Sequence, residues 1–170
     1  MIFCAFETFF SWNSLLFLLL GALAIGAAIT YTMGKHPYGY HALGDLSVFL
    51  FFGLLSTIGA FYLQTQILTM QVTIAACAIG LPIVGVLNVN NIRDMENDLA
   101  HHKITFASKI GTRNAKIYHT GLIIGSITLF CCAHLNIVIA FLPIWAVHIY
   151  CIWTLNGKKL DSQMPVLSLS

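Results

Sequence analysis

Charge is what this sequence has least of. Only 8% of its 170 residues are Asp, Glu, Lys or Arg, whereas 58% are apolar, and ordinary soluble domains carry about 25% charged residues. This composition excludes a soluble globular domain and indicates an integral membrane protein. The formal net charge is only +2, and we expect no nucleic-acid partner.

Cysteine motifs and a signal peptide are also missing. The five cysteines show no C-x-x-C spacing and lie mostly inside apolar runs, so they predict neither a disulfide framework nor a zinc site. Residues 1–14 contain no Lys or Arg and no small-residue cleavage site. We therefore expect that the chain has no signal peptide.

Long apolar runs predict an all-α polytopic transmembrane bundle that forms a single domain. A helix rises 1.5 Å per residue, so about 20 apolar residues cross a hydrocarbon core of about 30 Å. Gly53 and Gly59 are expected to allow close helix approach, and Pro82 is expected to kink its helix. The predicted spans are 15–33, 46–63, 67–89, 117–132 and 135–153.

The distribution of basic residues predicts the orientation of this bundle. Five spans place the connections 34–45 and 90–116, together with the C-terminal tail, on one side of the bilayer. All eight Lys and Arg residues lie in these segments. By the positive-inside rule that side faces the cytoplasm. We expect a multi-pass protein of the cell inner membrane whose polar loops, and the site that they form, face the cytoplasm.

The densest polar stretch runs from residue 88 to residue 111. Asp94 and Asp98 are four residues apart, so on a helix their carboxylates share one face, about 6 Å apart between Cβ atoms. Such oxygens are ligands for Mg²⁺, which keeps waters and binds with the help of a substrate's phosphates. Asn90 and Asn91 would line the mouth of that site. The alternative is a solvated loop at the membrane edge, in which acids balance nearby bases.

Basic and aromatic side chains near these acids have two interpretations. Lys35, Arg93 and Lys103 would neutralise a diphosphate while the metal bridges its oxygens, or they only set the topology. Tyr31 would line a pocket for an aromatic or allylic substrate and stabilise positive charge. Alternatively, Tyr31 belongs to an aromatic belt at the membrane interface.

The two polar loops, residues 31–45 and 88–111, resemble the UbiA superfamily of membrane prenyltransferases, and the similarity covers about residues 14–155. Within it the chain is most similar to the enzymes of menaquinone synthesis that act on 1,4-dihydroxy-2-naphthoate. The resemblance implies Mg²⁺-dependent transfer of a polyprenyl group from its diphosphate to that ring, and it places Mg²⁺ on Asp94 and Asp98. The expected catalytic residues are Asp94, Asp98 and Lys103, and the expected substrate-binding residues are Lys35, Arg93, Asn91 and Tyr31.

One departure from the family pattern leads to further expectations. The family carries a first aspartate-rich motif on an earlier helix, whereas Glu7 is the only acid before Asp45 in this sequence. We expect a partial version of the fold without the helices that bear the first motif, and a companion chain would supply them. The alternative is a non-catalytic membrane bundle. It would be an inactive remnant or a quinone- or haem-associated subunit, with His119 and His148 as haem ligands.

Overall fold

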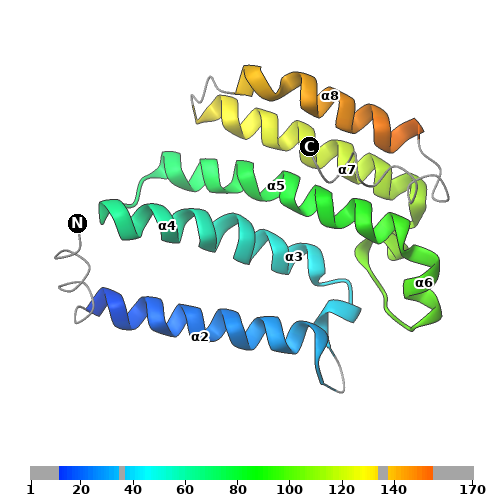
Figure 1. Cartoon of the computed structure of the whole chain (residues 1–170). Coiled ribbons are helices and arrows are strands. Elements are labelled where there is room, and N and C mark those ends of the chain that lie inside the picture. Colours follow the sequence, from blue (N-terminus) through cyan, green and yellow to red (C-terminus); the bar gives the residue numbers. More distant parts are fainter. Residues whose placement is uncertain (1–11, 35–36, 134–137, 155–170) are drawn as a thin grey trace. The chain divides into compact units, whose positions relative to one another are not determined.

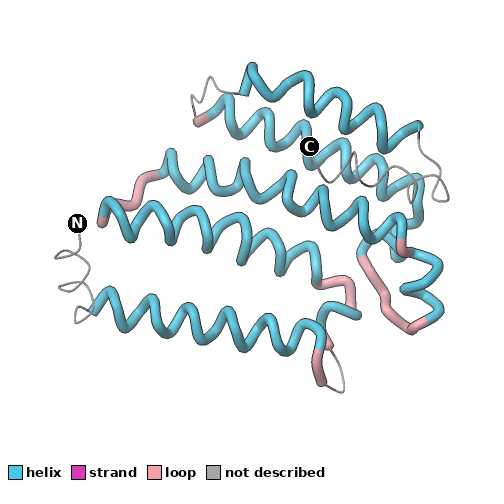
Figure 2. Tube along the Cα trace, in the orientation of Figure 1, coloured by secondary structure: helices cyan, strands magenta, loops and turns pink. Residues whose placement is uncertain are grey.

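The computed structural model describes residues 12–34, 37–133 and 138–154. The chain divides into two compact units, Met1–Tyr38 and Gly39–Ser170. The described residues form helices joined by short loops (Figure 2). The prediction of an all-α polytopic membrane protein is therefore confirmed.

The first unit contains one long helix, α2, Trp12–Thr32. At its end the Tyr31 ring packs edge-on against Tyr38, with ring centroids 5.3 Å apart and planes at 79°. The Tyr38 hydroxyl donates a 2.8 Å hydrogen bond to the carbonyl of Ala27. These contacts fold the chain back on the helix end. The 3₁₀ turn η1, Tyr38–Tyr40, then leads into the second unit.

The second unit is built around helix α5, Met70–Arg93. On one side α5 packs against a continuous helix made of α3, Gly44–Val48, the π-helical segment η2, Phe49–Leu55, and α4, Ser56–Thr65. On the other side it packs against α7, Phe106–Cys132, which in turn contacts α8, Val138–Thr154 (Figure 1). The short helix α6, Met95–Ala100, connects α5 to α7 at one end of the bundle.

Small residues and buried hydrogen bonds hold α5 against α7. Ala76, Ala78 and Ala115 are fully buried. The Asn88 amide donates to the Ala115 carbonyl at 2.9 Å, and the Ser126 hydroxyl donates to the Ala78 carbonyl at 2.6 Å. In a bilayer, helix association depends on such close packing and interhelical hydrogen bonds rather than on hydrophobic burial. The sequence of α5 and α7 is therefore suited to a membrane interior.

Two helices of the second unit approach each other closely at Gly53 of η2 and Gly80 of α5. A Cβ atom placed on Gly53 would lie 2.6 Å from the Gly80 Cα atom, and one placed on Gly80 would lie 2.8 Å from the Phe49 ring. A contact of 2.6 Å with backbone atoms is too short for any side chain. The expected role of Gly53 in close helix approach is confirmed.

Helix α7 begins before the apolar span that the sequence predicts. Thr105 caps it, because its hydroxyl accepts a hydrogen bond from the Ser108 amide while the Ser108 hydroxyl accepts one from the Thr105 amide. Gly111 then interrupts the helix with a φ of 80° and a ψ of 158°. Gly tolerates this backbone conformation because it has no Cβ. The first turns of α7 are therefore set off from its apolar part.

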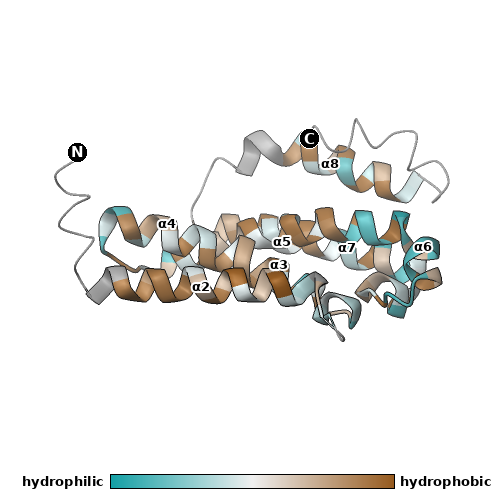
Figure 3. Ribbon diagram, turned by 60° about the horizontal axis from the view of Figure 1, so that its bottom comes forward, coloured by the Kyte–Doolittle hydropathy of each residue, from teal (hydrophilic) through white to brown (hydrophobic). Residues whose placement is uncertain are grey.

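Three of the described helices are long and apolar enough to cross a membrane: Gly44–Thr65, Met70–Arg93 and Phe106–Cys132. Two shorter apolar stretches, Leu15–Tyr31 and Leu142–Thr154, each overlap a predicted span. Figure 3 shows hydrophilic residues gathered at α6, whereas α4 and α5 are mainly hydrophobic. Within the described part of the second unit, hydrophilic residues therefore gather at the end of the bundle that α6 forms.

Candidate functional site

The corner between α5 and α6 brings the two predicted metal ligands together. Asp94 follows the last residue of α5 and occupies the N-cap position of α6. The amide of Asp98 donates a 2.8 Å hydrogen bond to the Asp94 carbonyl. The two aspartates are thus one helical turn apart, as their spacing in the sequence predicts.

Each of these acids is paired with a base. Arg93 donates two hydrogen bonds of 2.6 Å to the Asp94 carboxylate, from Nε to Oδ1 and from Nη2 to Oδ2. Nζ of Lys103 lies 3.2 Å from Oδ1 and 3.0 Å from Oδ2 of Asp98. We call Arg93, Asp94, Asp98 and Lys103 the charged corner.

Burial differs between the two pairs. The side chains of Arg93 and Asp94 are 27% and 39% exposed, whereas Asp98 is only 9% exposed beside a Lys103 that is 28% exposed. The hydrogen bonds from Arg93 lower the pKa of Asp94 below its usual value, against a smaller opposing effect of desolvation; the charges of Arg93 and Lys103 add to the lowering. Asp94 is therefore ionised at neutral pH.

The charged corner has the composition needed to bind a cation and an anion together. Two carboxylates and two bases cancel in charge. If a divalent cation took the carboxylates, the bases would be released for the oxygens of an anion. Among the described residues no group of three or more His, Cys, Asp or Glu side chains is arranged to hold a metal. The carboxylate pair suits Mg²⁺, which takes one or two carboxylates and fills its shell with waters and phosphate oxygens.

A second feature lies in the same unit as the charged corner. A pocket of about 360 Å³ opens between α3, η2, α5 and α7, with Phe49, Leu81 and Phe106 among its walls. Two polar side chains line it, Asp45 and Tyr118, and the two interact. The sequence analysis missed this pair. The available signal was an acid at the start of an apolar run, Asp45 before residues 46–63.

Two backbone hydrogen bonds connect the two polar loops of the second unit. Ile104 donates to the Tyr40 carbonyl at 3.1 Å, and Ala42 donates to the Ile104 carbonyl at 2.8 Å. These bonds pair His41 with Ile104 as an isolated parallel bridge. Lys103, whose side chain pairs with Asp98, precedes the bridge directly. The bridge therefore connects the charged corner to the loop that leads into Asp45.

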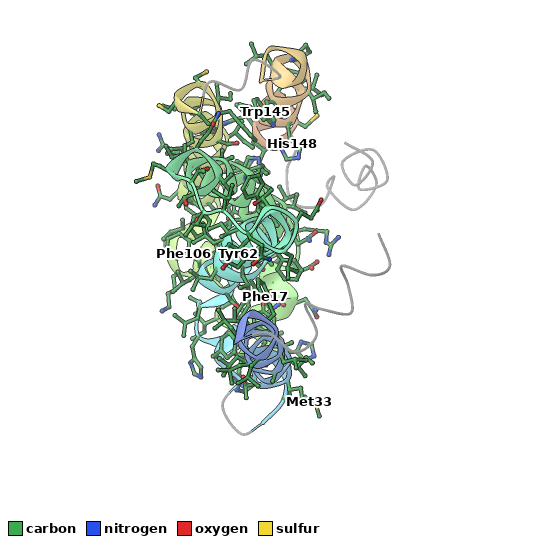
Figure 4. The ribbon with its side chains drawn as sticks, turned by 90° about the vertical axis from the view of Figure 1, so that its left-hand side faces the viewer. Phe17, Met33, Tyr62, Phe106, Trp145 and His148 are labelled. Atoms are coloured by element: carbon green, nitrogen blue, oxygen red, sulfur yellow. The ribbon has the colours of Figure 1, made fainter. Side chains whose placement is uncertain are left out.

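His119 of α7 and His148 of α8 are in direct contact. Figure 4 labels His148. Nε2 of His119 is 3.0 Å from Nδ1 of His148, and the rings stack with centroids 5.0 Å apart. Metal–imidazole bonds of about 2 Å on opposite sides of an iron would hold the two nitrogens about 4 Å apart. This geometry suits a hydrogen-bonded pair, and it does not favour the interpretation of these residues as haem ligands.

Comparison with known families identifies the chain. The model of the UbiA prenyltransferase family matches residues 1–164. The chain belongs to the UbiA prenyltransferase family. Three relatives illustrate its place within the UbiA family. The 1,4-dihydroxy-2-naphthoate octaprenyltransferase of Escherichia coli is 48% identical over 121 residues, 71% of this chain and 39% of the relative.

The other two relatives come from a bacterium and a eukaryote. The 1,4-dihydroxy-2-naphthoate octaprenyltransferase of Haemophilus influenzae is 49% identical over 100 residues, 59% of this chain and 32% of the relative. The UbiA prenyltransferase domain-containing protein 1 of Dictyostelium discoideum is 38% identical over 103 residues, 61% of this chain and 31% of the relative. The chain thus spans well under half the length of these UbiA relatives. No solved structure matches it significantly.

The remaining predicted substrate-binding residues of this UbiA chain are placed as follows. Asn91 is 6% exposed on α5, so it is buried. Tyr31 lies in the first unit against Tyr38. Lys35 lies outside the described residues. The structure thus brings together Arg93, Asp94, Asp98 and Lys103, and the roles of all these residues stay predictions.

Proposed function

We propose that this chain forms part of a membrane prenyltransferase that moves a polyprenyl group from its diphosphate to 1,4-dihydroxy-2-naphthoate, in menaquinone biosynthesis. The observation that carries the proposal is the charged corner, which sets two acids and two bases at one end of an apolar bundle. The names of the Escherichia coli and Haemophilus influenzae relatives support the acceptor.

Asp94 and Asp98 would hold Mg²⁺, which supplies Lewis-acid stabilisation of the departing diphosphate. Arg93 and Lys103, released from the acids, bind the diphosphate oxygens. Because Arg93 presents a fork of donors and Lys103 a single ammonium group, the two contacts orient the diphosphate as well as neutralise it. Donors held in place before the reaction stabilise developing charge without reorganisation.

The transfer breaks the allylic C–O bond, and the diphosphate leaves with its electron pair. The electron-rich naphthoate ring attacks the allylic carbocation and forms a C–C bond. Loss of the ring carboxylate as CO₂ restores the aromatic ring. Apolar walls protect the carbocation, because exclusion of water prevents its hydrolysis.

By the positive-inside rule, the basic residues near the charged corner support a position at the cytoplasmic face of the cell inner membrane. Lys103, Lys109 and Arg113 all lie between α6 and the apolar part of α7. A companion chain would supply the aspartate-rich motif that the family carries on an earlier helix. Together the two motifs would hold the diphosphate from two sides.

Retention of a prenyl diphosphate by the purified chain tests the proposal. The chain is placed in lipid nanodiscs and incubated with radiolabelled farnesyl diphosphate, with Mg²⁺ or with EDTA. We expect Mg²⁺-dependent retention that falls about 10-fold or more in Asp94→Asn and in Asp98→Asn, because hydrogen bonds and ligation by charged groups contribute about 1.5–3 kcal/mol each. Retention that is the same in EDTA as in Mg²⁺ would contradict the proposal.

Glu96→Gln is the matched control. Glu96 lies on α6 between the two aspartates and is exposed. The substitution removes the same charge at nearly the same place, so it separates ligation from a general electrostatic effect. We expect Glu96→Gln to retain the diphosphate as the unsubstituted chain does. Transfer to naphthoate is then assayed with and without the N-terminal portion of the Escherichia coli relative, which tests for the companion chain.

A further inference from the structure

The pocket between α3, η2, α5 and α7 has the size and the walls of a ring-binding site. Its volume of about 360 Å³ lies within the range of about 300–1,000 Å³ that is usual for small-molecule sites. Four of its wall residues are the apolar side chains of Phe49, Leu81, Phe106 and Leu122. Ligand sites of this kind combine apolar walls with a few polar groups that set the orientation of the ligand.

Asp45 is the polar group in this pocket that lacks a full set of partners. Asp45 is 8% exposed, and its Oδ2 atom is buried with no hydrogen-bond partner among the described residues. Tyr118 is the polar side chain that interacts with this carboxylate. A buried acceptor without a donor is destabilising, and the penalty is larger for a charged group. The Oδ2 atom therefore indicates a donor that the described residues do not supply.

The chemistry of the candidate ligands decides which of them supplies that donor. A prenyl chain has no N–H or O–H group. A diphosphate or a carboxylate would be repelled by Asp45, because like charges at close range in an apolar setting interact strongly. An aromatic ring that carries a hydroxyl can donate a hydrogen bond through the hydroxyl and pack its apolar faces against the pocket walls. The pocket of Phe49 and Phe106 accordingly favours a hydroxylated ring.

The position of the pocket fits the transfer step. Lys103 of the charged corner and Phe106 of the pocket wall are three residues apart, so their Cα atoms are separated by at most about 11 Å. Ile104, between them, is bonded to Tyr40 and Ala42 of the loop that leads into Asp45. One wall of the pocket and the charged corner are therefore joined by a short, hydrogen-bonded segment.

We propose that this pocket binds the ring of the hydroxynaphthoate acceptor and that Asp45 accepts a hydrogen bond from a ring hydroxyl. The inference rests on the proposed function and adds an acceptor-binding residue to it. In 1,4-dihydroxy-2-naphthoate the 1-hydroxyl is adjacent to the carboxylate, whereas the 4-hydroxyl is remote from it. Repulsion between carboxylates turns the acceptor so that the 4-hydroxyl faces Asp45.

A pair of ligands that differ only in this hydroxyl tests the inference. Binding of 4-hydroxy-2-naphthoate and of 2-naphthoate to the chain in nanodiscs is measured by equilibrium dialysis, with protein-free nanodiscs as the blank. Mg²⁺ and prenyl diphosphate are left out. We expect about 10-fold tighter binding of the hydroxylated ligand, the lower end of the range for a hydrogen bond to a charged group.

Substitution of Asp45 tests whether its carboxylate causes the preference for the hydroxylated ligand. Asp45→Asn keeps the size of the side chain but removes its charge, and we expect the preference to fall to about 2-fold or less, since neutral hydrogen bonds are the weaker ones. Phe49→Leu is the matched control, because it alters an apolar wall of the same pocket. It should weaken binding of both ligands by a similar factor and leave their ratio unchanged. Helicity by circular dichroism checks that each variant is folded.

The outcomes separate this inference from the proposed function. Equal binding of the two ligands to the unsubstituted chain overturns the inference, whether or not Asp45→Asn folds, and would indicate a pocket for an apolar chain. A preference that survives in folded Asp45→Asn overturns it as well. The unsubstituted chain could also prefer the hydroxylated ligand but show no Mg²⁺-dependent retention of the diphosphate. That result would contradict only the proposed diphosphate site.

Discussion

Removing the base of one ion pair of the charged corner should affect stability very differently from removing the base of the other. The two changes are Lys103→Met and Arg93→Met, which keep an apolar stem and delete the positive charge. Lys103→Met leaves the Asp98 carboxylate, 9% exposed, without its base, whereas Arg93→Met leaves Asp94, which is 39% exposed. Water reaches the second acid far more easily than the first. The stability loss should therefore follow burial rather than the number of hydrogen bonds.

The expected magnitudes come from the limits for exposed and buried pairs. Breaking a fully buried pair from one side costs about 3–5 kcal/mol, and exposed pairs contribute about 0.2–1 kcal/mol. Because Lys103 is itself 28% exposed, water partly stabilises its pair with Asp98, and we expect a loss of about 2 kcal/mol for Lys103→Met. For Arg93→Met we expect about 1 kcal/mol or less.

The assay is reversible unfolding in mixed detergent micelles, followed by circular dichroism, with the chain free of Mg²⁺ and diphosphate. The double variant Asp98→Asn/Lys103→Met completes a mutant cycle and should recover much of the loss, because it no longer buries an unpaired charge. Equal losses in Lys103→Met and Arg93→Met would refute the argument from burial. So would a double variant less stable than Lys103→Met alone.

Three further predictions concern packing, capping and pH. Gly53→Ala should lower stability by about 1–3 kcal/mol, measured by the same unfolding assay, because the new Cβ would lie 2.6 Å from the Gly80 backbone and force the helices apart. Thr105→Ala should lower it by about 1 kcal/mol through loss of the α7 cap, whereas Thr128→Ala, at an exposed site within α7, should change it less. The lowered pKa of Asp94 means that its ion pair stabilises the fold above pH 3.8 and that this contribution is lost as the pH falls below 3.8; a pH series of melting temperatures should show this loss in the unsubstituted chain and a smaller one in Asp94→Asn.

The acid pair of the charged corner was predictable because its geometry is local. Residues four apart on a helix lie on one face whatever the rest of the fold does, and Asp98 is indeed hydrogen-bonded to Asp94 through the backbone. The partners of these acids were less predictable. Two interpretations were open for Arg93 and Lys103, either contact with a diphosphate or a balance of charge with the nearby acids, and in the structure each base pairs with an acid. The spacing of charges does not say which of two partners a base contacts.

The pocket at Asp45 was not predictable in the same way. Asp45 and Tyr118 belong to different helices, and the contact between them depends on how α3 and η2 lie against α5 and α7. Similarly, the sequence offered His119 and His148 only as possible haem ligands, and it is the packing of α7 on α8 that brings Nε2 of His119 to 3.0 Å from Nδ1 of His148. Depth follows from the rise per residue, whereas rotation about the helix axis depends on packing.

The sequence by itself determined that this protein is a helical membrane protein, that its bases gather in a few segments, and that Asp94 and Asp98 share a helical face. These properties depend on composition and on the periodicity of a single helix. Only the tertiary structure decided that Asp98 is buried, that Ile104 bonds to the loop before Asp45, and that Asp45 faces an apolar pocket with Tyr118. Such contacts join segments far apart in the chain, and they depend on close approaches such as that of Gly53 to Gly80, which no local pattern of residues specifies.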